Sequence, residues 1–336
     1  MGWFFVINLL QFIPLLGRNN MKKYLATILT VIVVLTLSVL SFVLGGFSLN
    51  DLQKETLIIL LIVCGGSALY CFVVGQITHN NSQMDKLWSI LPIAYTWIIA
   101  IKGGFNPRLV IYAVLVTLWG IRLTLNFARK GAYSIKFWAG EEDYRWQILR
   151  SQKYFKNKFV WALFNLFFIS IYQNALVLAI CLPSLACMGS VAPLGVFDYL
   201  ATGFGFFFII YEATADEQQM SFQTQKWAMI NEGKKLEELP EPFDKGFNTV
   251  GLWNYSRHPN YLAEQAFWLV LFLFVIGAGV GKYYVFNWTM IGPLLLVLLF
   301  LGSSSMAESI SASKYPEYKD YQKVVSKYIP WRKYRH

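Results

Sequence analysis

The chain has 336 residues, of which 56% are hydrophobic, 17% are aromatic and only 14% are charged. Soluble domains carry about 25% charged residues, so this composition excludes an ordinary soluble protein and predicts an integral membrane protein. The net charge of +10 does not predict nucleic-acid binding, because the basic residues lie between apolar runs, where an anionic membrane surface attracts them. Four cysteines without a CxxC pair and only three histidines predict no metal site.

Hydropathy predicts an all-α polytopic membrane helix bundle with about eight spans, and seven to nine as the range. Residues 3–17 are apolar but shorter than the roughly 20 residues that a span needs. They are compatible with an interfacial helix, a short first span or an over-long start before Met21. The polar segment 215–260 is expected to be a loop. The expected spans are about 24–46, 57–77, 88–101, 109–128, 159–182, 196–214, 261–281 and 288–303.

The distribution of basic residues predicts the orientation of these spans. Eight spans place alternate loops on opposite sides, so segments 78–87, 129–158, 215–260 and the tail share the side of the segment before residue 24. That side, with Arg122 at the end of its span, receives 25 of the 29 Lys and Arg residues. Because positive charge collects on the cytoplasmic side, the C-terminus is expected in the cytoplasm.

One polar stretch, Gly251–Glu264, stands between two apolar runs where a hydrophobic helix should begin. Pro259 suits a first helical turn, because the amide that proline lacks would have no partner there. The remaining free amides and the helix dipole attract anions, and Arg257 and His258 add positive charge beside Asn260. This pattern predicts that a ligand phosphate binds at the mouth of the helix. The alternative interpretation is a basic anchor at the membrane surface.

Other polar residues lie at the expected cytoplasmic ends of spans. Polar groups in a span tend to face the bundle interior, so Arg122, Glu212 and Glu264 are candidates for function, with snorkelling to the interface as the alternative. Arg122 shares a helical face with Asn126, and Glu212 shares one with Asp216, because each pair is four residues apart. Such acids and bases could bind the ribose and phosphates of a dinucleotide, or form structural ion pairs. The chain has no GxGxxG after a strand, so a nucleotide site would be built from helix ends.

Four motifs stand out along the chain: Leu118–Leu123, Glu142–Trp146, Ala215–Gln218 and Gly251–Tyr261. Together, over about residues 70–333, they resemble an uncharacterised bacterial membrane family related to the steroid 5-alpha-reductases. The resemblance implies an NADPH-dependent reductase of an enone double bond, with the cofactor in a cavity open to the cytoplasm. It also implies that residues 57–336 form the reductase-like domain and that 1–56 add membrane segments outside it. The protein is then expected as a monomer in the bacterial inner membrane, with membrane lipids around it and a lipid-like substrate.

The resemblance assigns roles to single positions. Asn260 and Glu264 match an Asn and a Glu of the reductases' NADPH-contacting stretch, and Asp216 matches the Asp of their cofactor loop. Asp85, with Pro92 seven residues later, resembles the cavity Glu that helps to hold the substrate carbonyl. We therefore expect Asp85 and Glu264 to be catalytic. The residues expected to bind the cofactor are Arg122, Asn126, Arg145, Glu212, Asp216, Arg257, His258, Asn260 and Tyr321.

The chain also departs from the reductases. Leu123 stands where they place a Tyr that polarises the carbonyl, and Met306 and Ile310 stand near their Arg and His. Tyr172, Tyr211 and Tyr255 are the candidates to replace the missing hydroxyl.

Two other functions stay open. Methyltransferases that use S-adenosylmethionine on isoprenylcysteine or lipids also have an Arg-His-Pro-x-Tyr stretch, and Glu308 with Tyr318 and Tyr321 matches their acid and Tyr-x-x-Tyr. A transporter or assembly factor is the third hypothesis, but the polar motifs gather on one side of the membrane rather than along a path through it.

Overall fold

The computed structural model describes residues 32–33, 36–37, 39–40, 48–280 and 287–334. Segment 3–17 and most of the span expected at 24–46 lie outside this part of the chain. The described residues contain seven helices long and apolar enough to cross a membrane, and no strand. The prediction of an all-α polytopic membrane bundle is confirmed.

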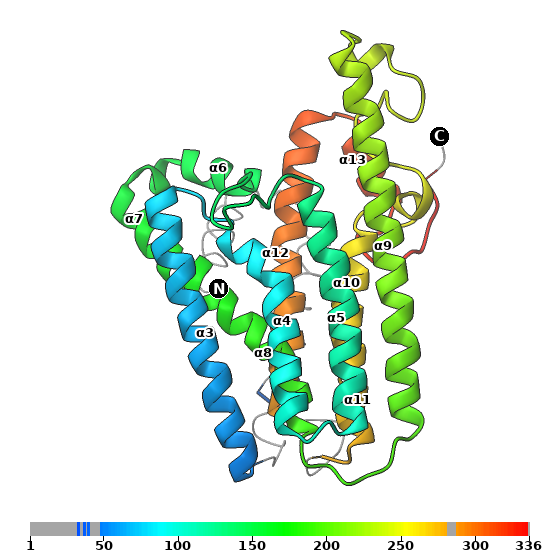
Figure 1. The fold of residues 1–336 in the computed structure, drawn as a ribbon. Coiled ribbons are helices and arrows are strands. Elements are labelled where there is room, and N and C mark those ends of the chain that lie inside the picture. Colours follow the sequence, from blue (N-terminus) through cyan, green and yellow to red (C-terminus); the bar gives the residue numbers. More distant parts are fainter. Residues whose placement is uncertain (1–31, 34–35, 38, 41–47, 281–286, 335–336) are drawn as a thin grey trace. The chain divides into compact units, whose positions relative to one another are not determined.

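The chain order of the helices can be followed in Figure 1. The long helices are α3 (Asp51–Thr78), α4 (Gln83–Lys102), α5 (Pro107–Ala128), α8 (Gln173–Ala186), α9 (Val196–Asn231), α10 (Pro259–Leu271) and α12 (Ile291–Lys314). The short helices are α6 (Tyr144–Ser151), η3 (Lys153–Lys156), α7 (Lys158–Phe164), the π-helix η4 (Asn165–Tyr172), η5 (Leu236–Glu238), η6 (Gly251–Asn254), α11 (Leu273–Gly277), η7 (Trp288–Met290) and α13 (Tyr318–Val324).

The chain divides into two compact units. Unit 1 comprises Met1–Gly203 and Val270–Leu296, and unit 2 comprises Phe204–Leu269 and Val297–His336. Helices α9, α10 and α12 each pass from one unit into the other. The residues expected in the functional site fall in both units, so each group is described within its own unit.

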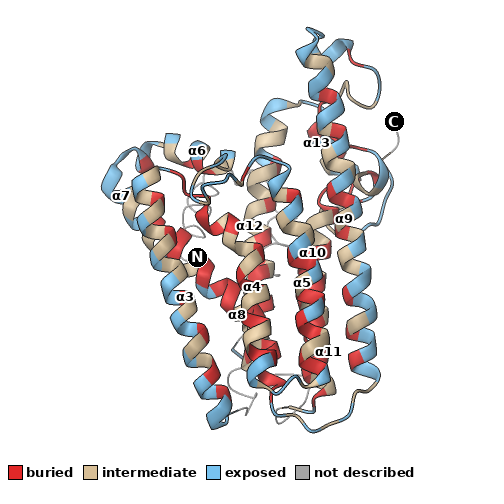
Figure 2. Ribbon diagram, viewed as in Figure 1, coloured by how far each residue is buried: buried red, intermediate tan, exposed pale blue. Residues whose placement is uncertain are grey.

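Helix packing in unit 1 centres on α4 and α8. Helix α4 packs against α5 and α8, and α3 packs against α8 and η4. Gly120 permits the close approach of α5 to α4, because a Cβ added there would lie 2.6 Å from the Ser89 carbonyl oxygen. Helix α3 buries few of its apolar side chains (Figure 2), as expected for a helix that faces lipid.

The far end of unit 1 is joined by a buried ion pair that the sequence analysis did not foresee. Arg108 donates from Nε to Asp198 Oδ1 at 2.6 Å and from Nη2 to Oδ2 at 3.0 Å. The same guanidinium donates to the Gly277 carbonyl at 3.1 Å, and both charged side chains are 1% exposed. These bonds connect the start of α5, the start of α9 and the end of α11.

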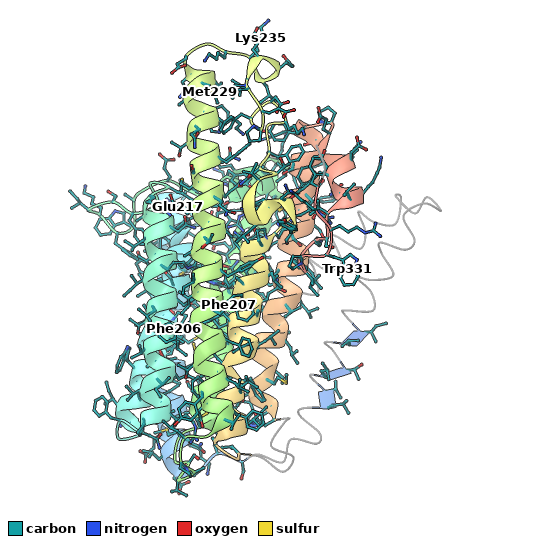
Figure 3. All side chains as sticks on the ribbon, turned by 90° about the vertical axis from the view of Figure 1, so that its right-hand side faces the viewer. Phe206, Phe207, Glu217, Met229, Lys235 and Trp331 are labelled. Atoms are coloured by element: carbon teal, nitrogen blue, oxygen red, sulfur yellow. The ribbon has the colours of Figure 1, made fainter. Side chains whose placement is uncertain are left out.

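Helix α9 corrects one expectation. Segment 215–260 was expected to be a loop, but α9 continues to Asn231. Hydropathy falls after Ala215, whereas Glu, Gln, Met and Lys keep a high helix propensity until Gly233, where φ is +96°. Figure 3 follows α9 from Phe206 and Phe207 past Glu217 to Met229.

Candidate functional site

Asp85 lies at the start of α4 in unit 1, where two side chains of α6 contact its carboxylate. Its Oδ2 accepts a hydrogen bond from Trp146 Nε1 at 2.8 Å, and its Oδ1 lies 4.0 Å from Arg145 Nη2. Arg145 also donates from Nε and Nη2 to Asp143, at 2.7 and 2.9 Å. The structure therefore brings together Asp85 and Arg145, which the sequence analysis had proposed for different roles. Asp85 is held as a hydrogen-bond acceptor by the Glu142–Trp146 motif.

Lys86, the next residue, holds the loop before α6 over the start of α4. It is fully buried and donates to the Phe137 and Ala139 carbonyls at 2.8 and 2.5 Å. Gln83 donates to the Trp138 carbonyl at 3.0 Å, from the same turn of α4. The sequence analysis missed Lys86, because nothing in its neighbourhood distinguishes it from the other basic residues of the loops.

Glu142 joins the two segments expected on the cytoplasmic side of unit 1. It accepts a hydrogen bond from the Asn81 backbone at 2.8 Å and pairs with Arg150, which also donates to the His79 carbonyl at 2.8 Å. Burial raises the pKa of Glu142, although the Asn81 amide and Arg150 oppose the shift. Burial also acts to raise the pKa of Asp143, but Arg145 outweighs it and the pKa is lowered. Segments 78–87 and 129–158 thus share one end of the unit, as the alternation of spans requires.

Arg122 and Asn126 lie on the last turns of α5, one helical turn apart. Arg122 is half-buried, and Asn126 is 7% exposed. The Asn126 side-chain oxygen has no hydrogen-bond partner among the residues that the structure describes. Their role in binding a cofactor stays a prediction.

In unit 2, Asn260 and Asp216 form a direct pair between α10 and α9. Asn260 Nδ2 donates to Asp216 Oδ1 at 3.1 Å. Within the described chain, the Asn260 side-chain oxygen is buried and accepts no hydrogen bond. Glu212 and Glu264 are buried as well, each one helical turn from a member of the pair. Four of the expected residues are thus carried by these two helices.

The stretch before α10 is hydrogen-bonded to α9. Gln218 Oε1 accepts from the Leu252 backbone at 2.8 Å, and Trp253 Nε1 donates to the Ala215 carbonyl at 3.0 Å. Gly251 is required for this contact, because its φ is +62° and an added Cβ would lie 2.5 Å from the Gln218 side chain. The Ala215–Gln218 motif and the Gly251–Tyr261 motif therefore lie against each other.

Arg257 and His258 share one acid, Glu308 of α12. Arg257 Nε lies 2.7 Å from Glu308 Oε1, and His258 Nε2 lies 3.1 Å from the same oxygen. Arg257 Nη1 also donates to the carbonyls of Gln322, at 3.0 Å, and Val325. Burial lowers the pKa of His258 even though Glu308 opposes the shift. Both side chains thus have partners within the protein and brace the start of α10.

Tyr321 anchors the same stretch from α13. Its hydroxyl donates to the Trp253 carbonyl, and its ring packs 5.3 Å from the rings of Phe247 and Tyr334, leaving the side chain 1% exposed. The backbone adds a parallel bridge between Ser256 and Ser326. The loop and the tail expected on the cytoplasmic side thus share one end of unit 2.

The motifs that meet in these contacts lie within one matched region. Residues 71–325 match the family model described as "Protein of unknown function (DUF1295)". The chain belongs to the DUF1295 family. A relative, the uncharacterized protein C594.04c of Schizosaccharomyces pombe, is 35% identical over 282 residues, which cover 78% of each chain. This relative of the DUF1295 chain is from a fission yeast, and the expected location in a bacterial inner membrane stays a prediction. No solved structure matches the chain.

Across the described part of this DUF1295 protein, no group of three or more His, Cys, Asp or Glu side chains could hold a metal ion. The four cysteines are buried and free.

Proposed function

We propose that this protein is a membrane-embedded, NADPH-dependent reductase of the C=C bond of an α,β-unsaturated lipid ketone, similar to the steroid 5-alpha-reductases. The observation that carries the proposal is the Asn260–Asp216 pair. The side-chain oxygen of Asn260, in the first turn of α10, accepts no hydrogen bond from a described residue. The Asn260 amide lies beside the Asp216 carboxylate. A carboxamide and a ribose offer donors for the Asn260 oxygen.

The fit of NADPH to unit 2 rests on four residues of the chain. Asn260 Oδ1 would accept from the carboxamide or from a ribose hydroxyl, and Asp216 would orient Asn260 through the bond at 3.1 Å. Glu212 and Glu264, buried one turn away, would add acceptors for hydroxyl groups. The free amides of the first turn of α10 favour a phosphate. We assign Arg257 and His258 to positioning this turn, because their side chains are bonded to Glu308.

The reaction needs two things from the chain itself. NADPH, when bound, would supply a hydride to the β-carbon and become NADP⁺. The α-carbon would take up a proton that comes ultimately from water. The protein must hold the ketone oxygen with hydrogen-bond donors, because negative charge develops on it. It must also exclude other water from the reacting carbons. Asp85 would take part as the acceptor that orients donors nearby.

Binding of NADPH tests the proposal. The purified, full-length protein is expected to change the fluorescence of NADPH, and Asn260→Ala and Asp216→Asn are expected to abolish the change. Glu217→Gln is the matched control, because Glu217 is exposed on the same helix, next to Asp216. If the unmutated protein does not bind NADPH at millimolar concentration, the proposal fails.

A methyltransferase is the second candidate, and one contact favours it. Glu308 lies beside Arg257 and His258 and accepts from Gln322 Nε2 at 2.8 Å, so the acid and the Arg-His-Pro stretch do meet. Stabilisation by S-adenosylmethionine but not by NADPH, measured as the shift of the unfolding temperature, would select this function.

A further inference from the structure

Two side-chain amides of unit 1 converge on a single glycine. The reference point is the position that a Cβ would take on Gly75, in the last turn of α3. From this point Asn81 Nδ2 lies at 3.2 Å and Asn165 Nδ2 at 3.3 Å. Asn81 precedes α4 and Asn165 begins η4, so three separate elements contribute to the arrangement. Asn81 is 2% exposed and Asn165 is fully buried.

Neither amide nitrogen has an acceptor among the described residues. The same holds for Asn81 Oδ1, whereas Asn165 Oδ1 accepts from the Ser170 hydroxyl at 3.3 Å. A buried polar group without a partner costs about 1–3 kcal/mol, and native proteins pair the great majority of such groups. Two unpaired donors on one face of Gly75 therefore indicate that an acceptor binds between them.

The neighbouring contacts of α3 show that its packing can satisfy buried amides. Asn174 donates to the Ser170 carbonyl at 2.7 Å, and its Oδ1 accepts from the Ser67 hydroxyl at 2.6 Å. The unpaired amide nitrogens of Asn81 and Asn165 lie against the other end of α3, near Gly75. The π-helix that Asn165 begins supports a special role, because π-helical turns occur frequently at functional sites.

We propose that Asn81 and Asn165 form a two-donor site for the ketone oxygen of the substrate, an inference that rests on the reductase function proposed above. A carbonyl oxygen has two lone pairs and accepts two hydrogen bonds. Donors held in place before the reaction stabilise the charge that develops on this oxygen. Gly75 has no side chain, so the oxygen could lie between the two amides beyond the Cβ position, at van der Waals distance from the Gly75 Cα.

The amide pair also accounts for a departure from the reductases. Leu123 stands where they place a carbonyl-polarising Tyr. Both oxygens of Asp85 face donors, Trp146 Nε1 at 2.8 Å from Oδ2 and Arg145 Nη2 at 4.0 Å from Oδ1. The two amides supply donors that neither residue offers.

Small ketones test this site whatever the skeleton of the natural substrate. The probe is cyclohexanone, compared with methylenecyclohexane, in which a CH₂ group replaces the oxygen. Binding to the purified, full-length protein is measured as a rise in the unfolding temperature, followed by tryptophan fluorescence. Cyclohexanone is expected to raise this temperature, and methylenecyclohexane is not. Asn165→Asp is expected to weaken cyclohexanone binding about tenfold, the effect of about 1.4 kcal/mol, because a carboxylate cannot donate.

Two glycines of α3 provide a matched pair of variants. Gly75→Ala places a methyl group against both amide nitrogens and is expected to abolish the shift by cyclohexanone. At Gly66, on the same helix, an added Cβ meets nothing within 4 Å, so Gly66→Ala is expected to keep the shift. Asn81→Leu separates a binding role from a structural one. An amide that bonds nothing in the ligand-free protein can be replaced by Leu without lowering its unfolding temperature, whereas the shift by cyclohexanone is lost.

The outcomes separate this site from the reductase proposal. If NADPH binds but cyclohexanone does not, or if Gly75→Ala binds cyclohexanone as the unmutated protein does, the amide site is refuted and the reductase stands. A lower unfolding temperature for ligand-free Asn81→Leu, with its ketone shift intact, refutes the site as well. If cyclohexanone binds through the amides and NADPH does not bind, the amides remain a ketone site and the reductase proposal fails.

Discussion

Arg257 Nε lies 2.7 Å from Glu308 Oε1, and both side chains are buried. This pair joins the stretch before α10 to α12 across 51 residues of sequence. The same carboxylate faces His258, so a single acid holds two of the residues that the sequence placed at the mouth of the helix. We infer that Glu308 determines the position of the first turn of α10, and with it that of Asn260.

Glu308→Gln is expected to destabilise the protein strongly. Gln has the same size, but it leaves the Arg257 guanidinium buried without a counter-charge, which costs about 3–5 kcal/mol. The measurement is the free energy of unfolding in detergent. Glu317→Gln, an exposed site beyond the end of α12, is the control and is expected to change little. Equal stability of the two variants would contradict the role of Glu308.

His258 predicts a pH dependence of stability. Burial lowers its pKa below the usual value of about 6.5. Just below that pH, His258 is therefore protonated in the unfolded chain but still neutral in the folded protein. Stability from this group is therefore complete above about pH 6.5 and is lost as the pH falls below that value. Measured between pH 5 and 8, the unfolding temperature of His258→Gln is expected to fall less on the acid side than that of the unmutated protein. Parallel curves would show that His258 does not titrate in this way.

Gly251→Ala tests the contact between η6 and α9. Both Gly251 and Gly233 have positive φ values, +62° and +96°, so Ala at either position costs about 1–2 kcal/mol of backbone strain. A Cβ at Gly251 would also displace Gln218, whereas a Cβ at Gly233 meets nothing within 4 Å. Gly251→Ala is expected to lower stability more than Gly233→Ala and to weaken NADPH binding. An equal loss of stability in both variants would show that the packing of Gly251 against Gln218 contributes nothing.

Asp198→Asn tests the buried ion pair at the far end of unit 1. It leaves the Arg108 guanidinium without its charged partner, and breaking a buried pair from one side costs about 3–5 kcal/mol. The exposed pair of Lys54 and Asp51, at 3.0 Å, is the control, and Lys54→Gln is expected to have no measurable effect on the unfolding temperature. NADPH binding by Asp198→Asn is expected to persist at temperatures where the protein is folded. Selective loss of NADPH binding would assign this end of the protein a direct function.

The spans could be predicted from the sequence because membrane insertion depends on local composition. A window of about 20 apolar residues is a property of a short segment, and expected spans such as 109–128 correspond closely to α5. Hydropathy was wrong about residues 215–231, because it measures polarity and not helix propensity. The polar end of α9 is helical although it is not apolar.

The candidate residues were identified from their type and position, but their partners were not. Asp216 and Asn260 are 44 residues apart, and Lys86 reaches carbonyls more than 50 residues away. No local pattern specifies such pairs, because they depend on which helix ends meet. Arg257 illustrates the difference, since its charge predicted an anion site and its neighbours include Glu308.

The sequence by itself determined the membrane class, the spans and the motifs of the DUF1295 family, because composition and short-range spacing carry this information. Only the tertiary structure decided which polar groups are satisfied. It paired Arg257 with Glu308 and left the amide nitrogens of Asn81 and Asn165 without acceptors among the described residues. Whether a buried polar group has a partner depends on packing between distant segments, and the cost of an unpaired one makes it evidence for a ligand.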